Sequence, residues 1–578
     1  MAPDRWGRYS SRPTMSMNDL EIARSIPLRP LSEVARVMGL TDEDLEPYGH
    51  TKAKVKLDRL AQPAEKQGKY IVVTAISPTP LGEGKTVHTV GISQALNRIG
   101  KGACCVIRQP SMGPVFGIKG GAAGGGYSQV VPPEEMNLHL TGDFHAVTSA
   151  HNLCAAFLDA HLFHGNEKNL DRDQITWRRV LDMNDRALRE VEVARGGEKN
   201  GDPRVTGFDI TSASEIMAVL GLAKDIHDLR KRLGEMVVGY DTDGKPVTAE
   251  DIKAAGAMTA ILKDALKPTL MQTLEGTPAL VHTGPFANIA HGNSSIVADY
   301  IALRSADYVV TEAGFGADMG AEKFFDIKCR ASGLKPDAAL LVATVRALKT
   351  HSGQFEIKPG KPLPEGLTQE NLAALEQGIG NLEKQIENVR QFGVPVVVAI
   401  NRFPTDSDAE VAFVKERALA AGASAAHVST LFAEGGKGGE DLAHALVKAC
   451  DEPSEFKLLY REEDSLKQKI ETIAQKIYGA DGVDYEPAAE EQLAKFEAAG
   501  FGKLPICMAK TQYSLSHDPK LKGRPTGFRF QVRDARCAVG AGFVYPLAGA
   551  IMTMPGLGKA PAGHQMDIDE NGDVVGMM

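Results

Sequence analysis

The residues best suited to chemistry lie in one short segment, residues 79–86, which ends in Gly-Glu-Gly-Lys-Thr. This ending matches the phosphate-binding pattern G-x-x-x-x-G-K-[ST], in which backbone N–H groups and a helix N-terminus hold an anion. Lys85 would reach the outer phosphates of a nucleotide, and the hydroxyl of Thr86 would bind Mg²⁺. Thr79 replaces the first glycine of the pattern. The candidate phosphate-binding residues are Thr79, Pro80, Leu81, Gly82, Glu83, Gly84, Lys85 and Thr86.

The segments on either side of this loop have the character that a phosphate loop needs. Residues 71–76 form a short β-branched run, typical of a buried strand, and the pattern after the loop predicts a helix over residues 85–99. An ordinary turn between a strand and a helix is the alternative. It does not explain why a Lys-Thr pair follows two glycines, so the order strand, loop, helix predicts nucleotide binding.

Further short apolar runs predict a sheet around this strand. They lie at residues 103–107, 279–282, 308–311, 339–344, 394–400 and 425–429, and each of the last four follows a segment able to form a helix. That alternation predicts an α/β fold with a doubly wound, mostly parallel sheet, similar to that of P-loop NTPases.

Ligands of such a sheet bind beyond the carboxyl ends of its strands. Arg108 follows one predicted strand, Glu312 and Asp318 follow another, and Phe403 and Phe432 follow two later ones. Glu312 and Asp318 are interpreted either as helix caps or as contacts to a metal or substrate. Cationic, acidic and aromatic side chains should therefore meet at one edge, which is stronger evidence for a site than the loop alone.

The chain is long enough for several domains. We expect a tail or tag at residues 1–16, a nucleotide-binding core at 17–452 and a smaller α+β domain at 453–578. Residues 17–66 are predicted to be helical, and residues of about 130–275 an inserted, mainly helical lobe with a hairpin that turns at Asp243-Gly244. In the last domain, residues 528–533 alternate as a strand does, and the glycines at 540–542 would turn to its partner.

Composition narrows the classes of function. With 578 residues, a net charge of −9 and a pI near 6.0, the chain is not expected to bind nucleic acid. The 7 cysteines show no C-x-x-C spacing, which favours a reduced, cytoplasmic protein over a disulfide framework or a zinc site. No apolar run approaches the ~20 residues needed to cross a bilayer, so no membrane partner is expected.

Several motifs resemble one known family. They include the loop at 79–86, the glycine-rich segment 113–127 and the segment 284–292, which reads Gly-Pro-Phe-Ala-Asn-Ile-Ala-His-Gly. Shorter matches lie at residues 140–143, 311–318 and 552–558. With these motifs, the chain from about residue 18 to its end resembles formate–tetrahydrofolate ligase in its monofunctional form.

The resemblance implies an ATP-dependent ligase that joins formate to N10 of tetrahydrofolate through formyl phosphate. It implies Lys85 and Arg108 as catalytic residues, with Arg108 gripping formate and then formyl phosphate. It also implies ATP with Mg²⁺, a monovalent cation such as K⁺ or NH₄⁺, and a homotetramer. The candidate folate-binding residues are Phe403, Phe432, Phe315, Gln109, Asp143 and Tyr127.

The sequence departs from the common pattern of this family at four positions. Gln109 stands where Glu usually follows the arginine, and Phe432 stands where Trp is common. Val87 replaces a hydroxyl residue, which leaves Thr86 as the one clear hydroxyl ligand for Mg²⁺. Leu81 sits at a variable loop position and should change little.

Two other functions stay open from the residues alone. One is a different ATP-dependent ligase that activates a carboxylate on the same fold. The other is a nucleotide-dependent switch or partitioning ATPase, which would need a second acidic Mg²⁺ motif and no aromatic slot. His282 and His291 are interpreted as structural histidines rather than ligands, and residues 567–572 as a C-terminal turn rather than a calcium site.

Overall fold

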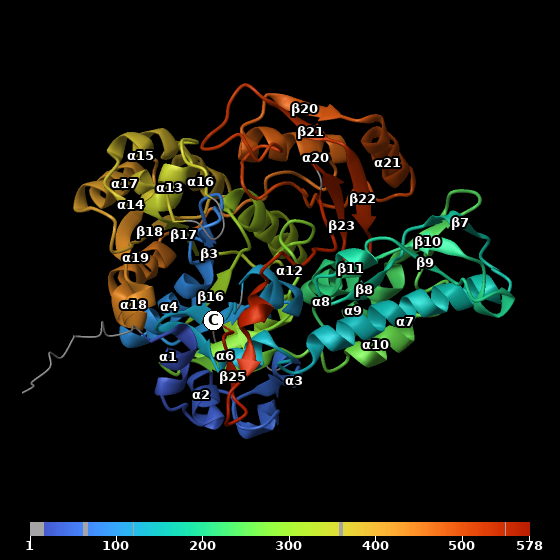
Figure 1. The fold of residues 1–578 in the computed structure, drawn as a ribbon, viewed down its shortest axis with the longest axis horizontal. Helices are drawn as coiled ribbons and strands as arrows, with labels where there is room; N and C mark the ends of the chain where they lie inside the picture. Colours follow the sequence, from blue (N-terminus) through green and yellow to red (C-terminus); the bar gives the residue numbers. More distant parts are fainter. Residues whose placement is uncertain (1–16, 62–66, 120, 358–361, 550, 578) are drawn as a thin grey trace, which may run out of the picture.

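A 12-stranded mixed sheet lies at the centre of the protein (Figure 1). The computed structural model describes residues 17–61, 67–119, 121–357, 362–549 and 551–577, so the predicted tail at 1–16 lies outside the described residues. Seven neighbouring strands run parallel. In sheet order they are β15 (Pro278–Val281), β4 (Ala103–Ile107), β16 (Tyr308–Glu312), β3 (Lys69–Ala75), β17 (Ala338–Ala343), β18 (Val396–Asn401) and β19 (Ala425–Ser429).

Helices cover both faces of these parallel strands, which is why their sequences are mostly apolar rather than alternating. In β3, Ile71 and Val73 belong to a buried cluster with α4 (Lys85–Arg98) and α19 (Glu440–Asp451). Val72, between them, belongs to the cluster on the other face, to which α11 (Ile296–Ser305), α16 (Gly380–Gln391) and α17 (Asp408–Ala420) contribute. The predicted α/β class and mostly parallel sheet are confirmed.

The sheet continues past β15 with antiparallel strands that the sequence did not indicate. They are β14 (Thr269–Thr273), β2 (Ala53–Val55) and β1 (Leu45–Pro47), and β6 (Ser128–Val131) branches from β14 to pair with β5 (Gly124–Gly125). The helical prediction for 17–66 is therefore wrong at residues 45–55. Strands of three residues are too short to show alternation. Around them lie α1 (Asp19–Ser25), α2 (Leu31–Val37), η1 (Asp42–Asp44) and α3 (Asp58–Ala61).

The segment between β6 and β14 is more mixed than the predicted mainly helical lobe. Its helices are α6 (Pro133–Asn137), α7 (Asp143–Phe163), α8 (Glu215–Leu222), α9 (Ile226–Glu235), α10 (Ala255–Leu262) and the short η3 (Arg186–Leu188), η4 (Glu198–Asn200) and η5 (Thr211–Ala213). Its strands are β7 (Leu170–Ile175), β8 (Arg179–Leu181), β9 (Val191–Val193), β10 (Arg204–Thr206), β11 (Phe208–Ile210), β12 (Val237–Asp241) and β13 (Pro246–Thr248). The polar, largely exposed sequence of β7 hid it from pattern analysis. The hairpin that turns at Asp243-Gly244 is confirmed.

The C-terminal segment contains helices and short strands. They are α20 (Leu466–Ile473), η9 (Ala474–Tyr478), β20 (Gly482–Tyr485), α21 (Pro487–Ala498), β21 (Arg529–Val532), β22 (Asp534–Ala538), β23 (Phe543–Leu547), η10 (Ala562–Gln565), β24 (Asp567–Ile568) and β25 (Val574–Val575). The predicted strand at 528–533 exists, but β21 pairs in parallel with β20, and the glycines at 540–542 join β22 to β23 instead. Residues 567–572 comprise β24 and most of the turn that joins it to β25, consistent with the expected turn.

The remaining short helices lie in connections. They are α5 (Met112–Pro114), η2 (Val115–Lys119), the π-helices η6 (Ala317–Ala321) and η7 (Phe324–Cys329), α12 (Arg330–Ser332), α13 (Val345–Thr350), α14 (Glu365–Thr368), α15 (Leu372–Gly378), α18 (Leu431–Glu434) and η8 (Gly435–Gly439). Among the described residues, every helix is too short or too polar to cross a membrane.

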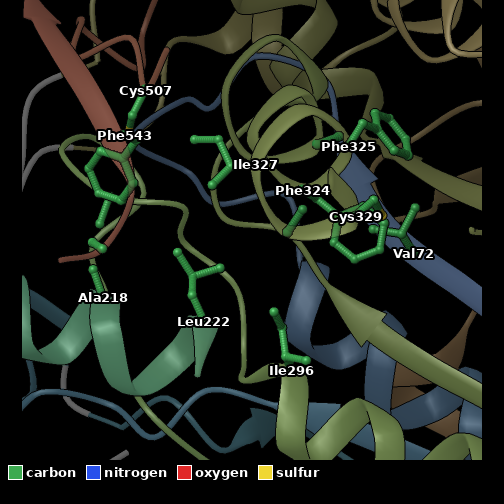
Figure 2. Close-up of a cluster of buried hydrophobic side chains, with 14 of the residues drawn as sticks. Val72, Ala218, Leu222, Ile296, Phe324, Phe325, Ile327, Cys329, Cys507 and Phe543 are labelled. Carbon is green, nitrogen blue, oxygen red and sulfur yellow. The ribbon is translucent and has the colours of Figure 1, made fainter. Parts of the chain in front are cut away.

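One buried apolar cluster joins the sheet to the inserted and C-terminal segments. Figure 2 shows Leu222 of α8, Phe324 of η7 and Phe543 of β23 around the same core, with Val72 of β3 at its edge. Segments far apart in sequence share this core, so the inserted lobe and the C-terminal segment pack against the sheet. The proposed boundaries at about 130, 275 and 452 stay predictions.

Candidate active site

The predicted phosphate loop lies between the carboxyl end of β3 and the amino end of α4. Gly84 precedes the helix with φ of +85°, and no side chain caps the helix N-terminus. A Cβ at Gly84 would lie 2.9 Å from the Asn401 amide nitrogen, a contact that only glycine avoids. The first N–H groups of α4 therefore remain available, and the helix dipole favours an anion at this position.

Thr79, the mismatch in the sequence pattern, holds the loop closed. Its backbone N–H and its hydroxyl both donate to Oε1 of Glu83, at 2.7 Å and 3.2 Å, and its hydroxyl oxygen accepts from the N–H of Leu81 at 3.3 Å. On the opposite side, the Asn401 amide donates to the Glu83 carbonyl. A glycine at position 79 would lose the hydroxyl bonds, so threonine supports the shape of the loop.

Two cations and two carboxylates meet beside the loop. The Lys85 ammonium lies 3.9 Å from Oε2 of Glu83. Oε2 of Glu312 accepts from the Thr86 hydroxyl at 2.8 Å, and its Oε1 lies 3.4 Å from Nη2 of Arg108. Burial lowers the pKa of Lys85 and raises that of Glu83, while the attraction between their charges opposes both shifts. Half-buried cations with few fixed partners suit a polyanionic ligand.

The sheet order explains how Arg108 reaches this group. Arg108 follows β4, the next strand in sequence after the loop, but β16 lies between β3 and β4 in the sheet. Glu312, the last residue of β16, therefore stands between Thr86 and Arg108. Sequence reasoning placed Arg108 at the same edge but left the role of Glu312 open between a cap and a ligand contact.

Phe403 follows β18, and its ring is covered by an arginine that the sequence analysis missed. The guanidinium carbon of Arg346 lies 3.4 Å from the centre of the Phe403 ring. Arg346 follows β17, the strand next to β3, and its buried Nε has no hydrogen-bond partner among the described residues. The run at 339–344 was recognised as a strand. Inspection of the residues after it would have revealed this third cation.

Phe432 lies on α18, just after β19, and is 51% exposed. The glycine-rich segment approaches it closely: a Cβ at Gly126 would lie 2.0 Å from the Phe432 carbonyl oxygen, and one at Gly125 would lie 2.9 Å from its ring. Glycines are therefore required where this segment meets the aromatic residue. Since β18 and β19 are adjacent, Phe403 and Phe432 rise from neighbouring positions of the same edge.

Phe315 and Gln109 lie in loops at this edge too. Phe315 has φ of +59°, an unusual conformation for a bulky residue that costs about 1–3 kcal/mol. Gln109 is 2% exposed, and neither atom of its side-chain amide has a partner among the described residues. A buried amide without partners is rare in folded proteins and calls for a polar ligand.

Two of the predicted folate contacts, Tyr127 and Asp143, have other partners in the structure, and their contact with folate stays a prediction. Tyr127 lies near Gln94, ~13 Å along α4 from Lys85, and lines a cavity of about 650 Å³ with Arg98 and Pro278. Pro278 begins β15, so this cavity lies toward the amino end of that strand. The backbone N–H of Tyr127 donates to the Phe432 carbonyl at 2.8 Å, so Tyr127 also adjoins Phe432. Asp143 is buried, and both its carboxylate oxygens accept from the Lys54 ammonium, at 2.6 Å and 2.7 Å. Its partner is a lysine of the neighbouring strand β2, which a sequence pattern cannot reveal.

Substitution of Asp143 should therefore damage stability rather than catalysis. Asp143→Ala leaves the Lys54 ammonium buried without its counter-charge, which should lower the free energy of unfolding by about 3–5 kcal/mol. Urea unfolding measures the loss, and activity per folded molecule should stay close to that of the natural protein. The double variant Lys54→Met/Asp143→Leu should recover much of the stability. A stable Asp143→Ala protein with a weakened substrate affinity would restore the original prediction.

Among the other candidates for binding roles, some have structural partners and others do not. Asp318 is fully buried, and its carboxylate pairs with the Lys510 ammonium at 2.8 Å, so it joins the core to the C-terminal segment rather than to a ligand. His282 is hydrogen-bonded to Ser295 and to the Ala265 carbonyl, as expected for a structural histidine. His291 is buried with no partner for either ring nitrogen among the described residues. Val87 packs against the core, so its lost hydroxyl needs no replacement.

Magnesium fits the oxygen atoms at the loop. The Thr86 hydroxyl and the Glu312 carboxylate are hard oxygen donors at the helix N-terminus, and Mg²⁺ is typically held by one or two such groups together with substrate phosphates. Within the described residues, no cluster of three or more His, Cys, Asp or Glu side chains is arranged to hold a metal by itself. The site therefore suits a metal that arrives with a nucleotide.

Together, the fold and the site define an α/β protein of the class that binds anionic ligands at the carboxyl edge of a parallel sheet. Comparison with known proteins narrows this class, because the family model described as formate–tetrahydrofolate ligase matches residues 17–578. A formate–tetrahydrofolate ligase of Saccharopolyspora erythraea is 59% identical over 561 residues, which cover 97% of this chain and 99% of that protein. Those of Desulforamulus reducens and Roseiflexus sp. strain RS-1 are 58% and 59% identical, again over 97% of this chain and at least 99% of their own length. The chain belongs to the formate–tetrahydrofolate ligase family.

Proposed function

We propose that this protein joins formate to N10 of tetrahydrofolate, with ATP converted to ADP and phosphate through formyl phosphate. The observation that carries the proposal is the placement of Lys85 and Arg108 around Glu312 at the helix N-terminus, in a chain of this family. A phosphate loop alone would serve any nucleotide. A guanidinium beside it adds a planar fork that suits a carboxylate or an acyl phosphate.

In the first step, an oxygen of formate attacks the γ-phosphorus and ADP leaves. Phosphoryl transfer of this kind depends on positioning and charge neutralisation rather than on a covalent enzyme group. The N–H groups of α4 and the Lys85 ammonium would hold the phosphates, and Arg108 would hold formate in line. The oxygens of Thr86 and Glu312 would hold Mg²⁺ together with the nucleotide, and the ion would supply further charge neutralisation.

In the second step, N10 of the folate attacks the formyl carbon and phosphate leaves with the oxygen that it received. The flat folate rings would lie against Phe432 and Phe403, and Arg346 would back one face of Phe403. The unpartnered Gln109 amide would bind polar atoms of the pterin. Phe315 stays a candidate at the same edge. Water must be excluded, because it would hydrolyse formyl phosphate.

Omission of one substrate at a time tests this proposal. ADP release should require formate, ATP and tetrahydrofolate together, and the absorbance of the product should identify 10-formyltetrahydrofolate. Acetate in place of formate should give no product. ADP formed with another acid would favour a different carboxylate-activating ligase, and ADP formed without folate or acid would favour a switch ATPase.

Truncation of Phe432 should weaken folate binding. Because ring stacking contributes about 1 kcal/mol or more, Phe432→Ala should raise the KM for tetrahydrofolate at least about fivefold. The KM for ATP should stay within about twofold, since the ring lies away from the loop. Phe432→Trp should preserve binding, because it keeps a flat aromatic face. An unchanged folate KM in Phe432→Ala would remove this residue from the site.

The assembly and the second cation also belong to this proposal. A homotetramer in the cytoplasm and stimulation by K⁺ or NH₄⁺ are expected from the resemblance to the family. Light scattering of the purified protein would test the first, and a comparison of rates in potassium, ammonium and tetramethylammonium chloride would test the second.

A further inference from the structure

Glu312 occupies a position between the two halves of the site. Its carboxylate is 7% exposed, and its two oxygens face different partners, the Thr86 hydroxyl at 2.8 Å and the Arg108 guanidinium at 3.4 Å. Thr86 belongs to the nucleotide side, and Arg108 to the formate side. The carboxylate connects them directly by non-covalent contacts, because the strand that carries Glu312 lies between β3 and β4.

We propose that Glu312 is a positioning residue through which a bound magnesium nucleotide tightens the binding of formate. This inference rests on the function proposed above and extends it, because it assigns a coupling role to a residue outside the phosphate loop. The coupling acts through the contacts of Glu312 with Thr86 and Arg108, in addition to any contact of its carboxylate with the metal.

The hydrogen bond from Thr86 has the direction that such coupling needs. The hydroxyl proton is donated to Glu312, so the lone pairs of the hydroxyl oxygen remain free for a cation. A cation on that oxygen polarises the O–H group, and hydrogen bonds in a chain strengthen one another in this way. The carboxylate would then be fixed more firmly on the Thr86 side.

The fixed carboxylate in turn orients Arg108. The arginine has few other restraints: Nη1 donates to the Pro285 carbonyl at 3.2 Å, and its buried Nε has no partner among the described residues. A guanidinium that is held in place loses less freedom when it binds a carboxylate, so the affinity for formate rises. By thermodynamic reciprocity, formate should tighten nucleotide binding by the same factor.

The test compares formate binding with and without a nucleotide. Isothermal titration calorimetry with formate as the probe should give a dissociation constant that falls about tenfold when the protein is saturated with MgADP. We call the ratio of the formate dissociation constants without and with MgADP the coupling factor. In Glu312→Gln this factor should fall to near one. The amide oxygen of Gln can accept from Thr86, but its NH₂ group then faces the N–H groups of Arg108. Both groups are donors, so no hydrogen bond forms between them. Glu312→Asp keeps the charge but is one methylene too short to span both partners, so it should lose the coupling too.

Asp337 provides a matched control. Its carboxylate also spans two partners, the Lys69 ammonium at 3.1 Å and the Tyr70 N–H at 2.8 Å, but at the amino end of β3. Asp337→Asn should leave the factor unchanged. ADP binding without Mg²⁺ and the melting temperature report whether each variant is folded.

Two outcomes contradict the inference and are separable from a failure of the proposed function. A factor of about ten that persists in a folded Glu312→Gln protein would overturn the role of Glu312. A natural protein that binds formate and MgADP independently would also overturn it, while leaving the proposed function intact. A natural protein that binds neither ligand would contradict the proposed function itself.

Discussion

Lys85→Ala should lower the rate of 10-formyltetrahydrofolate synthesis by about 10²–10³-fold, because it removes a preorganised charge from the phosphate being transferred. The lysine lies at the start of α4 and its side chain is 16% exposed. Among the described residues its one ion pair is with Glu83, at 3.9 Å. Steady-state ADP release at saturating formate and folate measures the effect.

The loss should not come from unfolding. Burial lowers the pKa of Lys85, which means that its charged form is destabilised in the protein without ligand. Removal of the ammonium should therefore leave the free energy of unfolding unchanged or slightly raised. Lys85→Met, which keeps the apolar stem, serves as the control for packing. A Lys85→Ala rate within threefold of the natural rate would exclude a role in phosphoryl transfer.

Arg108→Ala should lower formate-dependent ADP release by about 10³-fold, because no other described cation follows β4 to hold the carboxylate. MgADP binding in the absence of formate should change little, since the guanidinium lies two strands away from the loop. The rate and the calorimetric affinity together separate the two substrates.

Arg108→Lys distinguishes charge from geometry. Lysine keeps the charge but has no planar fork, so it should recover only a small part of the rate, and added guanidinium ion should restore activity to Arg108→Ala. Near-normal formate KM and turnover in Arg108→Ala would remove the main assignment of this account.

Much of the sheet could be predicted from sequence because its strands are buried on both faces. The runs at 103–107 and 425–429 match β4 and β19 residue for residue. The first is apolar and buried throughout, so its bounds are clear in the sequence. The short strand β2 and the polar strand β7 escaped prediction because each depends on a partner distant in sequence. Their pairing is a tertiary effect that no local pattern records.

The site residues also separate into those that a local sequence pattern reveals and those that depend on distant contacts. Lys85, Thr86 and Arg108 could be predicted because each lies in or beside a recognisable strand-to-loop junction. The ion pair of Asp143 with Lys54 and the position of Tyr127 between the cavity at Pro278 and Phe432 could not be predicted, because both depend on neighbours distant in sequence. The importance of Glu312 and Arg346 also emerged only from their contacts, with Thr86 and Phe403 respectively.

The central claim is that formate is activated by transfer of the γ-phosphoryl group to one of its oxygens. Synthesis with formate labelled by ¹⁸O at both oxygens tests this directly, by mass spectrometry of the inorganic phosphate released. The account predicts one ¹⁸O atom in each phosphate, because the oxygen that attacks phosphorus leaves with it when N10 attacks the formyl carbon. Phosphate without ¹⁸O, formed together with 10-formyltetrahydrofolate, would contradict it.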